Sequence, residues 1–171
     1  MRATEKQTAK RTDKQPRRSP LVPDTVGREI ARHHWDSVDC GCGRPAGHLV
    51  DALWDAAEGH PAAFHALEGH AFHLGRLRGP APAVCGVLMA VWSAGPPRQA
   101  TREALLWALL RLLGAEDDGS SHEAGLYGQC AAHIRAALPS LRDTATGRPG
   151  SVSAAYADGI LRLLDLTVQG Y

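Results

Sequence analysis

Apolar residues recur along this chain at steps of three and four, the spacing that places side chains on one face of a helix. The run after Pro45 shows this spacing in Leu49, Val50, Leu53, Trp54 and Ala57. Glycines and prolines fall between such runs, where they end one helix and begin the next. The pattern predicts about seven amphipathic helices and no strand.

Glycine and proline positions set the expected helix limits. We expect a first helix from Asp24 or Thr25 to Trp35, and a second from Pro45 to Gly59. A third should begin at Pro61, carry its stripe through Leu74 and end at Gly75. Four more helices are expected. The first runs from Gly79-Pro80 to Gly95, the second carries Ala104 to Leu113, the third runs from about Ser121 to Pro139, and the fourth follows Gly150. Residues 116–121 are expected to form a loop.

The spacing of the helix pairs favours a repeat architecture. Pair starts near Pro45, Pro80 and Ser121 are 35 and 41 residues apart, within the range of stacked helical repeats. The short break at Gly59 implies antiparallel neighbours. The sequence therefore predicts an all-α fold, a short α-solenoid of antiparallel helix pairs, with a closed seven-helix bundle as the competing architecture.

The stretch from Trp35 to Leu88 carries a recognisable set of apolar, glycine and histidine positions: Trp35, Val38, Gly43, Leu49, Leu53, Leu67, His73, Gly75, Ala81, Ala83, Val84 and Leu88. This set resembles the first repeats of a group of bacterial HEAT-repeat proteins. The chain departs from that pattern at Leu74, Arg76 and Cys85. The resemblance implies a right-handed HEAT-like repeat domain over residues 23–171, and it carries no catalytic residue across.

Charge is unevenly distributed along the chain. The net charge of the chain is +1. Residues 1–20 have seven basic and two acidic groups, whereas the remaining residues have 12 arginines and 16 acidic groups and are therefore acidic. Residues 1–20 contain almost no apolar residues to bury, so we expect a disordered basic tail over residues 1–22. They also lack the apolar core of a secretory signal, which favours a cytoplasmic protein. After residue 20 the chain has arginine but no lysine, alongside many alanines and glycines, which indicates a GC-rich bacterial genome. The longest uncharged run, Gly79 to Pro97, is broken by prolines and glycines at both ends and makes a poor membrane span.

Cysteine and histidine gather in one region. Cys40 and Cys42 form a C-x-C pair, and seven of the nine histidines fall between His33 and His73. His70 and His73, three residues apart, could approach the two cysteines across a helix pair. A Cys2His2 zinc site of Cys40, Cys42, His70 and His73 is therefore one alternative. The other is that the histidines only pack at helix ends, with no cofactor bound.

The remaining candidates concern partners. Trp54, Trp92 and Trp107 are potential interface anchors, and Arg76 with Arg78 forms a small basic cluster. No nucleophile turn, phosphate loop or metalloprotease motif is present, which favours a non-enzymatic scaffold or adaptor that binds another protein or peptide. The alternatives are a zinc-binding helical domain and nucleic-acid binding through residues 1–20.

Overall fold

A computed structural model of the 171-residue chain describes residues 19–115 and 125–168. These residues are mostly helical, which confirms the predicted helical fold. The α-helices are α1 (Asp24–Ala31), α2 (Leu49–Ala57), α3 (Pro61–His65), α4 (Ala81–Ala94), α5 (Gln99–Leu113), α6 (Leu126–Arg135), α7 (Leu138–Gly147) and α8 (Val152–Val168). Two 3-10 turns, η1 (Trp35–Ser37) and η2 (Ala46–His48), and a hairpin of β1 (Phe72–His73) and β2 (Arg76–Leu77) complete the described elements.

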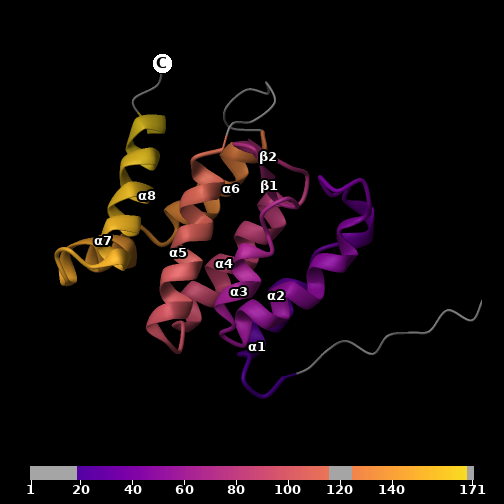
Figure 1. Ribbon diagram of the computed structural model, residues 1–171, viewed down its shortest axis with the longest axis horizontal. Helices are drawn as coiled ribbons and strands as arrows, with labels where there is room; N and C mark the ends of the chain where they lie inside the picture. The colour runs from indigo at the N-terminus through magenta and orange to yellow at the C-terminus, as the bar shows by residue number, and fades with distance from the viewer. Residues whose placement is uncertain (1–18, 116–124, 169–171) are drawn as a thin grey trace, which may run out of the picture.

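Contacts arrange six of the helices in two rows. Figure 1 shows α4 and α5 near the centre of the molecule and α7 and α8 at one side. In one row α4 packs against α1 and α6, and in the other α5 packs against α3 and α8. Contacts between α4 and α5 join the rows. The buried residues of α4 and α5 are almost all apolar, as expected for helices covered on several sides.

A buried polar contact fixes the α2–α3 turn to α5. Gly59 has a φ of +93°, which suits glycine and ends α2 as the sequence predicts. Its carbonyl oxygen accepts hydrogen bonds from Thr101 Oγ1 at 2.9 Å and from Arg98 Nη2 at 2.7 Å. Thr101 is fully buried, so this carbonyl pairs the only polar group on that side chain.

The prediction of a helix from Pro61 to Leu74 is wrong. Helix α3 ends at His65, and a β-hairpin pairs Phe72 with Leu77 and His73 with Arg76. The turn of the hairpin is Leu74-Gly75, and both residues have positive φ values of 49° and 74°. Successive positive φ values are typical of the type I′ turn, whose twist matches that of a two-stranded ribbon. Leu74 is 82% exposed, so it does not belong to an apolar stripe.

Two other predicted limits are wrong. The first helix ends at Ala31 rather than Trp35, because Trp35 folds back and its Nε1–H donates to the Ile30 carbonyl at 2.7 Å. The segment expected to form one helix up to Pro139 contains the end of α6 and the start of α7. Pro139 lies in the first turn of α7, where the missing N–H of proline costs nothing.

Some predictions fall outside the part of the chain that the structure describes. They are the basic tail up to residue 18, the loop over residues 116–121 and the helix cap at Ser121. Across residues 19–115 and 125–168, we find no helix whose length and apolar character would let it cross a membrane.

Candidate metal centre

Four metal-binding side chains meet at one end of the molecule. They are Cys40 and Cys42 in the segment between η1 and η2, His48 at the end of η2, and His70 in the turn between α3 and β1. One donor atom from each of them lies within 4.8 Å of all the others. Two segments that are distant in sequence therefore contribute to one cluster.

A tight turn presents the two cysteines. The Gly43 N–H donates to the Cys40 carbonyl at 3.0 Å, and the Cys40 N–H donates to the Arg44 carbonyl at 2.9 Å. Gly43 has a φ of +80°, a conformation that favours glycine. The turn is anchored where the Ala46 N–H donates to the Val38 carbonyl at 2.8 Å. The sequence C-G-C-G thus folds back within four residues and places both thiols on the same side as His48.

A second tight turn presents His70. The His70 N–H donates to the Leu67 carbonyl at 3.1 Å, and the Gly69 N–H donates to the Phe72 carbonyl at 2.7 Å. Gly69 has a φ of +89°, so the chain turns sharply out of α3 and into β1. Leu67 and Phe72 are buried on either side of this turn and hold it against the core.

The distances between donor atoms match those of a tetrahedral zinc site. Zinc binds sulfur at about 2.3 Å and nitrogen at about 2.0 Å, so neighbouring ligand atoms are about 3.3–3.8 Å apart. Cys40 Sγ lies 3.2 Å from His70 Nδ1, Cys42 Sγ lies 3.6 Å from His48 Nε2, and the two histidine nitrogens are 3.3 Å apart. Three of the six donor–donor distances are therefore close to those of a tetrahedral site, and the other three are no longer than 4.8 Å.

His48 is oriented for binding by its other ring nitrogen. The Nδ1 atom lies 2.8 Å from the Pro45 carbonyl oxygen, which accepts a hydrogen bond from it when Nδ1 carries the proton. That tautomer leaves the lone pair of Nε2 directed at the cluster. A backbone carbonyl in this role is typical of histidines that bind metals.

Electrostatics differ between the ligands. Burial, followed by the charges of His48 and Arg44, lowers the pKa of His70, which keeps its ring neutral. Burial raises the pKa of the Cys40 thiol. Desolvation opposes ionisation of Cys42, but hydrogen bonds from the Arg44 side chain and backbone hold the pKa of that thiol below its ordinary value.

Arg78 lies beside this turn. Its side chain packs against Gly41, where a Cβ would be 2.8 Å from Cγ of the arginine, so a larger residue between the two cysteines would require the arginine side chain to shift. The Nε atom of Arg78 is buried and has no hydrogen-bond partner among the described residues. This buried N–H lies at the turn that carries the two cysteines, 3.3 Å from the position of a Cβ on Gly41.

The structure brings together three of the four residues expected at a zinc site. Cys40, Cys42 and His70 are in the cluster, but His48 is the fourth member in place of His73. His73 lies on β1 with an exposed side chain, because the segment is a hairpin rather than a helix. The spacing C-x-C-x5-H, from Cys40 to His48, was the sequence signal for the missing residue.

The residues expected to bind a partner are scattered. Trp54 and Trp92 are buried, each with 8% of its surface exposed, and Trp107 is half-buried against His65 and Phe72. Arg76 is exposed on β2, whereas Arg78 is half-buried at the cysteine turn. The three tryptophans therefore pack mainly within the domain.

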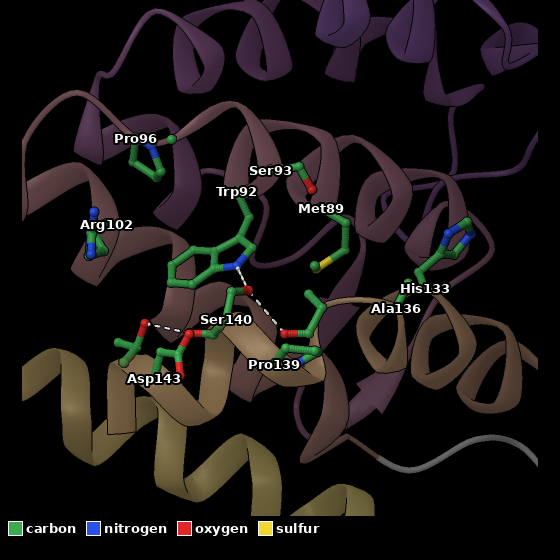
Figure 2. A pocket seen from close by; sticks show the side chains of 13 residues that line it. Met89, Trp92, Ser93, Pro96, Arg102, His133, Ala136, Pro139, Ser140 and Asp143 are labelled. Atoms are coloured by element: carbon green, nitrogen blue, oxygen red, sulfur yellow. Dashed lines mark hydrogen bonds between the residues drawn. The ribbon is translucent and has the colours of Figure 1, made fainter. Parts of the chain in front are cut away.

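Trp92 lines a pocket of about 460 Å³ between α4, α6 and α7 (Figure 2). Its Nε1–H donates to Ser140 Oγ at 2.8 Å, and the guanidinium carbon of Arg102 lies 5.8 Å from the centre of the indole ring. Asp143 and His133 also line the pocket. The hydrogen bond from Trp92 joins α4 to α7, which gives the indole a role in packing.

Comparisons with protein-family models, with curated proteins and with solved structures found no match. The resemblance to HEAT-repeat proteins therefore stays a prediction. The geometry of the four-residue cluster is the strongest indication of function in the described part of the chain.

Proposed function

We propose that this chain is a zinc-binding helical domain in which Cys40, Cys42, His48 and His70 hold one structural Zn²⁺. The observation that carries the proposal is the mutual approach of the four donor atoms, all within 4.8 Å. Thiolate and imidazole ligands in a set of four are the combination that zinc prefers in proteins. Two thiolates also balance the charge of the ion.

The number of ligands supports a structural role. Catalytic zinc sites keep one position open for water or substrate, whereas structural sites fill all four positions with side chains. Here four side chains each offer one donor atom, and these atoms all lie within 4.8 Å of one another. A bound ion would join the cysteine turn to the turn that follows α3.

The direct test is the zinc content of the purified full-length protein, measured by inductively coupled plasma mass spectrometry. We expect one zinc per chain. Replacement by Co²⁺ should give the intense visible absorption of tetrahedral cobalt with thiolate ligands. A chain that binds neither metal when it is folded and reduced would contradict the proposal.

A pair of histidine variants provides the matched control. His48→Asn removes a proposed ligand, whereas His73→Asn changes an exposed histidine outside the cluster. We expect the first variant to lose zinc and the second to keep it. Equal zinc content in both variants would assign the ion to other residues.

The finer architecture belongs to the same proposal. We infer that the two rows of helices form a short right-handed HEAT-like solenoid, and the contacts of α4 with α1 and α6 and of α5 with α3 and α8 support this. In this arrangement the zinc site closes the N-terminal end of the solenoid. Binding of another protein or peptide by such a scaffold stays a prediction, as does a cytoplasmic location.

A further inference from the structure

The two cysteines of the cluster differ sharply in exposure. Cys42 is exposed at the tip of the turn, whereas Cys40 is 5% exposed and packs in the core beneath it. Their sulfur atoms lie within 4.8 Å of each other, with Gly41 as the single residue between them. One thiol can therefore meet a solvent-borne reagent while the other lies close behind it.

We propose that hydrogen peroxide opens this site by linking Cys40 and Cys42 in a disulfide, which releases the zinc. This inference rests on the proposed zinc site. It adds a mode of regulation in which the metal is held under reducing conditions and lost under oxidising ones.

The reaction proceeds in two balanced steps. The Cys42 thiolate attacks one oxygen of the peroxide, the O–O bond breaks, and a sulfenic acid and a hydroxide ion form. The Cys40 thiolate then attacks the Cys42 sulfur, an S–S bond forms, and the sulfenic oxygen leaves as a second hydroxide. The two sulfurs lose two electrons and the peroxide gains them, while two protons from solvent convert the hydroxides to water.

The order of the steps follows from access. Peroxide reaches Cys42 first because that residue is exposed, and Cys40 is placed to resolve the sulfenic acid. Closing the bond brings the sulfurs from within 4.8 Å to about 2.05 Å, and the small residue Gly41 allows the turn to tighten. The disulfide removes both thiolate ligands together, and two neutral histidines alone bind zinc weakly.

The other two cysteines serve as an internal control. Cys85 and Cys130 are fully buried between α4 and α6, and the Cys85 thiol donates to the Cys130 carbonyl at 3.5 Å. Peroxide has no path to either sulfur in the folded protein. Oxidation confined to Cys40 and Cys42 is therefore expected.

The test uses the zinc-loaded full-length protein and a colorimetric zinc indicator. Adding hydrogen peroxide should release one zinc per chain. Peptide mapping by mass spectrometry should then show a Cys40–Cys42 disulfide, with Cys85 and Cys130 still reduced. Dithiothreitol and added zinc should restore the metal content.

The outcomes distinguish this inference from the proposed function. If the protein contains no zinc at the start, the proposed function fails. If zinc is bound and excess peroxide leaves it in place, only this inference fails.

A variant without the other two thiols separates oxidation at the cluster from oxidation elsewhere. The double variant Cys85→Ala/Cys130→Ala keeps all four proposed ligands, so peroxide should release its zinc at the wild-type rate. Zinc that stays bound in this variant would overturn the proposal. In the wild-type protein, oxidation that stops at a sulfinic acid on Cys42 without a bond to Cys40 would overturn it as well, whatever the folding of the variant.

Discussion

Cys40 Sγ lies 3.2 Å from Nδ1 of His70, although the two residues are 30 positions apart in the chain. This approach joins the turn between the two 3-10 elements to the turn that enters the hairpin. Close backbone packing supports it, because a Cβ on Gly79 would lie 2.7 Å from the Asp39 carbonyl oxygen. The cysteine turn and the residue before it thus contact the chain on both sides of the hairpin, at His70 and at Gly79.

Removal of the metal should lower the thermal stability of the domain. A ligand present at 1,000 times its Kd stabilises the folded state by about 4 kcal/mol, which corresponds to a Tm change of about 8–16 °C for a domain of this size. We expect a chelator to lower the Tm of the zinc-loaded protein by about this amount in differential scanning calorimetry.

The variant His48→Asn is the control for chelation. Its Tm should already be low, and the chelator should leave it unchanged. A chelator effect of the same size in both proteins would show that the metal binds elsewhere. An unchanged Tm in zinc-loaded wild-type protein would mean that the ion contributes nothing to folding.

Replacing Leu74 should stabilise the protein. This residue has a φ of 49°, a conformation that costs most L-residues about 1–2 kcal/mol, and its side chain is 82% exposed and gains little from burial. Asparagine adopts this conformation readily, and Asn-Gly is the preferred pair for the type I′ turn. We expect Leu74→Asn to raise the free energy of unfolding in urea by about 0.5–1 kcal/mol.

The comparison with Leu74→Ala separates strain from the loss of the apolar side chain. Alanine removes most of the side chain but keeps the backbone cost, so its free energy of unfolding should stay within about 0.5 kcal/mol of the wild-type value. If Leu74→Asn is less stable than the alanine variant, then the leucine side chain makes contacts that favour this turn.

Helical segments with a long, regular apolar pattern were predictable from sequence. The helix through Leu105, Leu109 and Leu112 is α5, and all three of these side chains are fully buried. The hairpin was not predictable from the sequence, because Leu67, Ala71 and Leu74 follow helical spacing by coincidence. Only two residue pairs form the ladder, so the decisive signal was the turn chemistry at Gly75 rather than any alternation of apolar residues.

The candidate site was partly predictable for a related reason. Residue type alone drew attention to Cys40, Cys42 and His70, whereas the choice of the fourth member depends on the path of the chain. A helix through residue 74 would have placed His73 on the same face as His70. In the hairpin the chain reverses after His73, and His48 approaches through η2 instead.

His133 should make stability depend on pH. This residue on α6 faces α1 across Gly86 of α4, and burial lowers its pKa, while Glu29 acts to raise it and Arg32 and His33 act to lower it. A neutral histidine is therefore favoured in the folded state. In the unfolded chain the pKa is about 6.5, so as pH falls below that value the unfolded state binds the proton more readily.

The sign of the effect follows from this difference. The contribution of the neutral His133 side chain to the free energy of unfolding is fully present above about pH 6.5. It is lost as pH falls toward the lower pKa that His133 has in the folded state. The free energy of unfolding should thus decrease from pH 7 to pH 5.5, and it should decrease less in His133→Gln, whose side chain does not titrate. Urea unfolding at several pH values measures this pH dependence. Both proteins contain the metal site, so its own pH dependence does not affect the comparison. His34→Gln, at an exposed position outside the pocket, should follow the wild-type curve. A wild-type slope in His133→Gln would place the pH dependence on another group.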